Sequence, residues 1–192
     1  MPSGANSTTS SQGKYLTLVK FQDPFRAAFN DQAGFKDGIL ARLGETYLIA
    51  AEANGRKSAP DFAKALTYIN ALRTRAAYKA NERRPEAVMF EGVLPTDLGS
   101  TTALMQATDV LWTTNATSEM YPATATTAQQ RFIHFILNER ARELCGELYR
   151  WEDLVRTETL VIRTRQFNAD AALGIQDYHK LRPIPQLSLI HI

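Results

Sequence analysis

The chain has 192 residues, of which 44% are hydrophobic and 22% charged, so it can bury a core of ordinary size. Its 22 Lys and Arg nearly cancel its 20 Asp and Glu, leaving a formal net charge of +2. This balance argues against a nucleic-acid-binding protein, because binding to phosphates needs a local excess of positive charge. The single cysteine, Cys145, excludes an internal disulfide and a cysteine-based metal cluster, and we expect it to be a buried, unreactive thiol.

Residues 1–14 are small and polar, which predicts a disordered leader. They lack the basic start and apolar middle of a secretion signal, and no apolar run in the sequence approaches the length of a membrane-spanning helix. Residues 14–20, with the sequence KYLTLVK, alternate in hydrophobicity and predict a short strand. Residues 21–37 contain a proline and a glycine, which favour an irregular connection.

Residues 37–77 predict two amphipathic helices joined by a short turn at Asn54-Gly55. We expect Ser58 to cap the second helix, because Pro60 would then lie in its first turn. Two such helices form a hairpin of the tetratricopeptide type, and only one clear copy is present. A single copy cannot bury both of its faces, so another element must pack on it.

Residues 79–128 predict a loop insertion, because they contain three prolines, two glycines and a tract rich in Thr, Ala and Ser. A short helix is expected near Leu104 to Trp112. Trp112 and Tyr121 are candidate ligand-binding residues, since flat aromatic rings flanked by polar residues suit the apolar faces of sugars. We favour a second interpretation for Trp112, in which its side chain fastens the loop to the helices.

Residues 129–157 predict one long amphipathic helix, the charged helix, with Trp151 as a core anchor. Glu139, Glu143 and Glu147 recur every four residues and so share a face, where three carboxylates could bind a metal ion or act as an acid and base pair. Arginines lie at pairing distance from these acids, however. The expected ion pairs are Glu139–Arg142, Arg140–Glu143, Glu147–Arg150 and Glu152–Arg156. We therefore interpret the charges as structural, and predict a protein that is not an enzyme and needs no cofactor.

Residues 158–186 predict a loop with a short ordered segment, followed by an extended stretch, because two prolines frame Ile184. Residues 187–192, LSLIHI, form an atypical tail.

Four segments in order resemble the SusD/RagB family of outer-membrane proteins. They are LGETYLIAAEA at 43–53, ALTYINALRTRA at 65–76, LNERARELCGELYRWEDLVRT at 137–157 and YHKLRPIPQ at 178–186. The third segment carries the family's charged motif, which here comprises Glu139, Arg140, Arg142, Glu143, Glu147, Arg150, Trp151, Asp153 and Arg156. The resemblance covers about residues 14–186.

This resemblance implies a mostly α-helical fold, with a tetratricopeptide-like hairpin packed on the charged helix and long irregular loops. It implies a non-catalytic protein that binds oligosaccharides or other nutrients on the outer face of Bacteroidetes outer membranes. The implied partner is a TonB-dependent transporter, and no nucleic acid is expected. Family members carry a signal peptide and a lipid-bearing cysteine, so the chain is expected to be a C-terminal fragment of a lipid-anchored protein.

Two other functions stay open at this stage. One is a helical adaptor that binds a protein or peptide through its tetratricopeptide-like hairpin. The other is a metal-assisted hydrolase that uses Glu139, Glu143 and Glu147.

Overall fold

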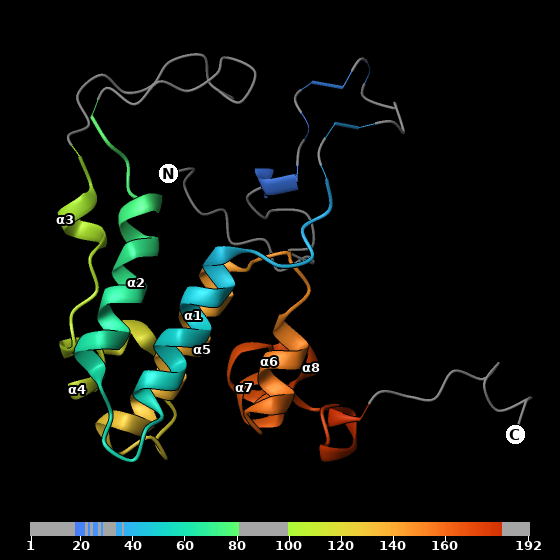
Figure 1. Ribbon diagram of the computed structural model, residues 1–192. Coiled ribbons are helices and arrows are strands. Elements are labelled where there is room, and N and C mark those ends of the chain that lie inside the picture. The colour runs from blue at the N-terminus through green and yellow to red at the C-terminus, as the bar shows by residue number, and fades with distance from the viewer. Residues whose placement is uncertain are drawn as a thin grey trace, which may run out of the picture. The chain divides into compact units, whose positions relative to one another are not determined.

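A computed structural model describes residues 18–21, 23, 25–26, 28, 34–35, 37–80 and 100–181 of the chain (Figure 1). The chain divides into two compact units, Met1–Gly38 with Arg83–Thr96, and Ile39–Glu82 with Asp97–Ile192. In the first unit, the described part of the predicted strand is a 3-10 helix, η1, at Val19–Phe21. Residues 14–17, like the predicted leader at 1–14, lie outside the described residues.

The second unit contains eight α-helices among its described residues, and no strand is found there, which confirms the predicted mostly α fold. The helices are α1 (Leu43–Gly55), α2 (Phe62–Ala76), α3 (Thr102–Met105), α4 (Val110–Thr113), α5 (Ala128–Glu143), α6 (Arg150–Arg156), α7 (Leu160–Phe167) and α8 (Ala169–Ala172). A 3-10 helix, η3 (Thr117–Glu119), lies between α4 and α5, and another, η4 (Asp177–Lys180), follows α8.

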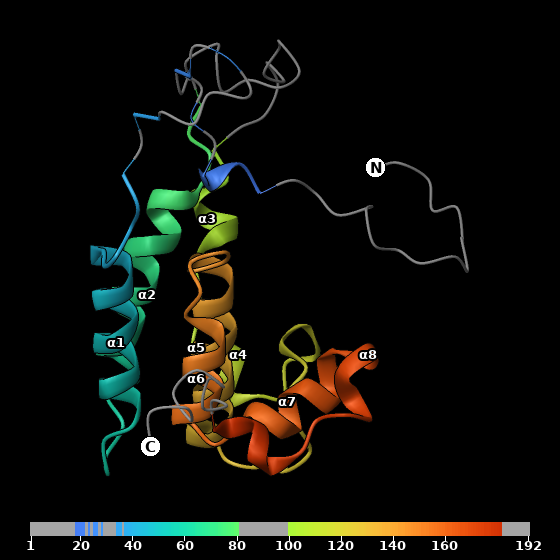
Figure 2. The ribbon, with the colours of Figure 1, turned by 90° about the vertical axis from the view of Figure 1, so that its right-hand side faces the viewer.

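The predicted hairpin is present as α1 and α2, which pack against each other along their length (Figures 1 and 2). The first helix begins at Leu43 rather than near residue 37. Asp61, not Ser58, caps the second helix, and its side chain accepts a hydrogen bond of 2.9 Å from the backbone N–H of Lys64. The turn places Asp61 rather than Ser58 next to the first helical residue, because the Asp61 N–H bonds the carbonyl of Asn54 at 3.0 Å.

The element that packs on the hairpin is α5. A capping box begins this helix, since Thr127 and Gln130 each accept a hydrogen bond from the other's backbone N–H. Helix α5 packs on α1, and α4 packs on α5. The fully buried side chains at their junction are Leu48, Ile69, Trp112, Phe132, Phe135 and Ile136. Four aromatic rings meet in this core, with centroids 5.0 Å apart for Trp112 and Phe132.

The close approach of α1 and α5 depends on Gly55, the last residue of α1. A Cβ atom added at Gly55 would overlap the ring of Phe132, which is fully buried. We therefore expect Gly55→Ala to destabilise the fold by about 1–3 kcal/mol, because the ring has no space to move. Urea unfolding followed by circular dichroism would measure the change. Gly38→Ala is the control, since an added Cβ there meets nothing within 4 Å; equal effects of the two substitutions would contradict the packing described here.

The charged helix is not one continuous helix, contrary to the sequence-based prediction. Helix α5 ends at Glu143, and α6 begins at Arg150. Gly146 between them has φ 80°, a left-handed conformation that glycine adopts without strain and that ends a helix. The turn also exposes Leu148, which is 91% accessible although the apolar spacing placed it on the buried face.

Three smaller predictions also differ from the structure. The helix expected near Leu104 to Trp112 is two short helices, α3 and α4. After residue 157, where a loop with one short ordered segment is expected, the chain forms two helices, α7 and α8, and α7 packs against α6. Of the predicted extended end, Tyr178 to Lys180 belong to η4, and residues 182–192 lie outside the described residues.

Candidate functional site: the charged motif

The arginines and acids of the charged motif bind different partners from those that their spacing predicts. The Glu139–Arg142 pair forms as expected, with 2.8 Å between Oε2 and Nη2. Arg140 binds Asp153 and Glu45, and Arg150 donates to the carbonyl of Leu137. Arg156 binds Glu52 and Asp153. Most of these contacts join two helices, so the motif holds the helices together rather than stabilising each one alone.

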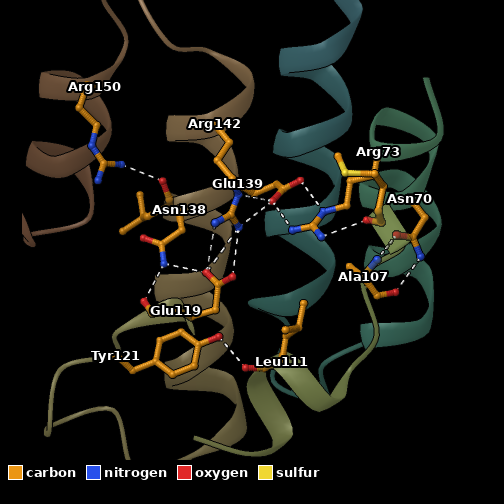
Figure 3. A network of polar contacts seen from close by, with 12 residues as sticks. Asn70, Arg73, Ala107, Leu111, Glu119, Tyr121, Asn138, Glu139, Arg142 and Arg150 are labelled. Carbon is orange, nitrogen blue, oxygen red and sulfur yellow. Dashed lines mark hydrogen bonds and ion pairs between the residues drawn. The ribbon is translucent and has the colours of Figure 1, made fainter. Parts of the chain in front are cut away.

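Glu139 is the centre of one cluster, shown in Figure 3, and is only 4% exposed. Arg73 of α2 donates to both of its carboxylate oxygens, at 2.9 and 2.8 Å, and Arg142 donates to Oε2. Burial alone would raise the pKa of Glu139, but the hydrogen bonds and charges of the two arginines outweigh it and lower the pKa. The buried carboxylate therefore stays ionised and links α2 to α5.

The cluster continues towards α7 through Asn138. Its amide N–H donates to a carboxylate oxygen of Glu119 at 2.8 Å, and its amide oxygen accepts from Arg163 (Figure 3 shows the Glu119 contact). Arg163 is 3% exposed. Burial, together with the nearby charge of Arg150, lowers its pKa to about 10. Arg163 also contacts Nδ1 of His134 at 3.2 Å, so an arginine joins α7 to α5 through neutral groups.

His134 makes the free energy of unfolding depend on pH between about pH 6.5 and 4. Burial, and secondarily the charge of Arg163, lowers its pKa from 6.5 to about 4. Below pH 6.5 the unfolded chain binds a proton that the folded protein does not, so stability falls as the pH drops from about 6.5 to 4. Carboxylates such as Glu139, whose pKa is lowered from 4.5, lower the free energy of unfolding mainly below that value. Urea unfolding between pH 7 and 4.5 should show this loss in the wild type.

The control for this prediction is His134→Gln, which keeps a polar side chain of similar size without a titrating ring. We expect its free energy of unfolding to change little between pH 7 and 4.5. A variant with the same pH slope as the wild type would show that another group causes it.

The three acids of the hydrolase hypothesis are all engaged by arginines. Glu139 binds Arg73 and Arg142, as described above. Glu143 accepts from Arg42 and, at 2.7 Å, from Arg75, while Glu147 accepts from Arg42 at 2.8 Å through each of its two oxygens. No group of three metal-binding side chains is found in the described part of the chain. A metal ion on these carboxylates would have to displace the arginines, so the arrangement gives no support to a hydrolase.

The structure also places the aromatic candidates and the cysteine. Trp112 is completely buried, as expected for a side chain that fastens the loop to the helices, and its role towards a ligand stays a prediction. Tyr121 is partly buried, and its hydroxyl donates to the carbonyl of Leu111 at 2.7 Å, so its role towards a ligand stays a prediction. Trp151 is only partly buried and is not the core anchor that its position in the helix suggested. Cys145 is exposed, contrary to expectation, because it lies in the turn after α5.

Several partners of the motif were not apparent in the sequence. Arg42 precedes α1 as its N-cap residue, and Glu45 and Glu52 lie within α1, all about a hundred positions before the residues they bind. Arg73 lies on α2 and Arg163 on α7. No spacing rule for charges on a single helix could have indicated them, since each contact depends on how the helices pack.

The order of the helices, the hairpin and the charged motif can now be set beside known proteins. A family model described as the SusD family matches residues 2–186 of the chain. The chain belongs to the SusD family. Comparisons with curated proteins and with solved structures find no significant match. SusD-family proteins are non-catalytic, substrate-binding proteins associated with the outer membrane, and nutrients including glycans are their ligands. Within the described residues, no helix is long and apolar enough to cross a membrane.

Proposed function

We propose that the protein captures oligosaccharides or related nutrients at the outer-membrane surface and delivers them, without catalysis, to a TonB-dependent transporter. The observation that carries this proposal is the match of residues 2–186 to the SusD family. The acids of the motif support it, because arginines bind Glu139, Glu143 and Glu147, the three carboxylates that the hydrolase hypothesis would need as acid and base. We place the protein on the cell surface, held by a lipid anchor.

The alternative of a peptide-binding adaptor has less support. Such a protein would use a face of the helical hairpin as a groove for its partner. Here the inner face of α1 and α2 is filled by Phe132, Phe135 and Trp112, all with no exposed surface. The hairpin is therefore a scaffold whose inner face is already occupied.

Co-purification tests the proposal directly. The full-length protein would be tagged and isolated from detergent-solubilised outer membranes, and a TonB-dependent transporter encoded beside it should co-purify. Isothermal titration calorimetry with neutral oligosaccharides would test ligand binding separately. Absence of the transporter, together with no heat of binding for any sugar, would contradict the proposed function.

A further inference from the structure

Helices α7 and α8 pack on each other (Figure 2) but bury few apolar side chains. Leu160 and Arg163 are the buried residues of α7, and α8 has none. Leu160 does not belong to the core cluster around Trp112 and Phe132. Residues 160–172, the α7–α8 segment, therefore depend largely on polar contacts for their position in the second unit.

Arg163 makes the central contact between this segment and α5. Its Nη1 lies 3.2 Å from Nδ1 of His134, and its Nη2 donates to the amide oxygen of Asn138. A guanidinium group can only donate, so Nδ1 of His134 must accept, which requires a neutral ring with its proton on Nε2. Gln166 of α7 adds a contact of 2.8 Å to the carbonyl of Met120. The Arg163–His134 hydrogen bond therefore forms only while His134 is neutral.

The surroundings of Arg163 are unfavourable for a second positive charge. Its two partners are neutral groups, and its Nε is buried without a hydrogen-bond partner. Arg150 of α6 places another positive charge nearby, and the charge of Glu119 in η3 opposes it. Glu119 already accepts from Arg142, at 3.4 Å. A proton on His134 would therefore put a cation in direct contact with a buried guanidinium.

Opening of this contact is coupled to the proton on His134. While α7 is docked on α5, burial and the charge of Arg163 hold the pKa of His134 at about 4. With α7 released, the ring meets water and its pKa returns towards 6.5. Docking is therefore strongest above pH 6.5 and weakens as the pH falls towards 4. The equilibrium constant for opening rises by about twentyfold from pH 7 to pH 5.

The connection between α6 and α7 provides a hinge. Glu158 lies there with φ 58°, a left-handed conformation that is unfavourable for a residue with a side chain. Its side chain is 73% exposed, so a change of its backbone conformation disturbs little packing. Rotation at Glu158 can move α7 away from α5 and relieve this strain.

We propose that the contact of Arg163 with His134 is a pH-sensitive switch, in which protonation of His134 releases the α7–α8 segment while α1, α2 and α5 stay folded. Such a release differs from a general loss of stability at low pH, because the segment leaves before the rest of the unit unfolds. The switch needs no ligand or partner, so it is independent of the proposed function.

Hydrogen–deuterium exchange of the 192-residue chain, followed by mass spectrometry, tests the switch. Protection factors are taken at pH 7 and pH 5 relative to the exchange rates of unstructured peptides, which removes the intrinsic pH dependence of exchange. We expect the protection of α7 to fall by about tenfold or more between pH 7 and pH 5. At pH 5 it should be lower than the protection of α5 and unchanged by dilute urea, because a local opening exposes little surface. The amides of α5 should lose protection in urea.

His134→Gln should abolish this fall in protection, since a glutamine side chain does not titrate. His179→Gln is the matched control and should respond to pH as the wild type does, because His179 lies in η4 and accepts from Gln176 instead. The switch is wrong if His134→Gln shows the wild-type fall, or if the wild type shows no fall. Equal protection and equal urea dependence of α7 and α5 at pH 5 would also overturn it, since the whole unit would then unfold together.

Discussion

Replacing Asp153 with alanine is expected to destabilise the protein by about 3–5 kcal/mol, because it leaves the guanidinium of Arg140 buried without its main counter-ion. The two side chains are 4% and 3% exposed and lie 2.6 Å apart. Asp153 also accepts from Arg156 at 3.0 Å, so one substitution loosens contacts of two arginines. Arg140 also binds Glu45 of α1, and Arg156 binds Glu52 of α1. The substitution should therefore loosen the packing of α6 on the rest of the second unit.

The measurement is urea unfolding at pH 7, followed by circular dichroism. A double variant, Arg140→Met with Asp153→Leu, should be less destabilised than Asp153→Ala, since it buries no unpaired charge. The control is Glu158→Gln, because Glu158 is 73% exposed and binds Lys180 at the surface. Its unfolding midpoint should not change measurably. If Asp153→Ala behaved like this control, the Arg140–Asp153 pair would not be a buried contact in solution.

The hairpin could be predicted from sequence because its information is local. Apolar residues recur at helical spacing, and Asn54-Gly55 marks the end of the first helix. The same reasoning overextended the charged helix. Apolar residues keep their spacing from Phe132 to Val155, but the left-handed turn at Gly146 rotates α6 relative to α5. Two left-handed residues in this turn, Gly146 and Leu148, thus separate the apolar pattern of α6 from that of α5.

Charge pairing was the least predictable part of the site. Spacing identified the charged residues of the motif and the pair Glu139–Arg142, but it did not indicate the partners of Arg140, Arg150 and Arg156 on other helices. A residue three or four positions away lies close on any helix, whereas an arginine on another helix can bind both carboxylate oxygens at once. Arg73 does this to Glu139, and Arg156 does it to Glu52. Tertiary packing decided these contacts, and no single-helix rule contains that information.

The two tryptophans show the same limit. Trp151 had a regular place in an apolar pattern, yet it is only partly buried. Trp112 lies in a helix of four residues within a segment rich in Thr and Ala, too short to show a period, and it is completely buried. Its burial depends on the aromatic residues of α2 and α5, which approach it only in the folded chain. A loop residue can therefore be the centre of a core.

Trp112→Ala is expected to cost about 3–5 kcal/mol, the range for removing a large aromatic side chain from a core. The ring lies 5.0 Å from Phe135 and 5.7 Å from Phe62, centroid to centroid, so its loss opens a cavity between three elements. Trp151→Ala removes the same side chain from a partly buried position and should cost clearly less. Urea unfolding of the two variants gives the comparison directly, and a larger loss for Trp151→Ala would mean that the core lies elsewhere.

A milder substitution separates the core role of Trp112 from a role in ligand binding. Trp112→Phe keeps an aromatic ring in the core and removes an indole N–H that has no hydrogen-bond partner, so it should destabilise the fold much less than alanine does. Under conditions where the variant is folded, its affinity for a neutral hexasaccharide should equal that of the wild type. A selective loss of sugar binding by folded Trp112→Phe would instead make the indole a ligand contact. The complete burial of the side chain argues against that outcome.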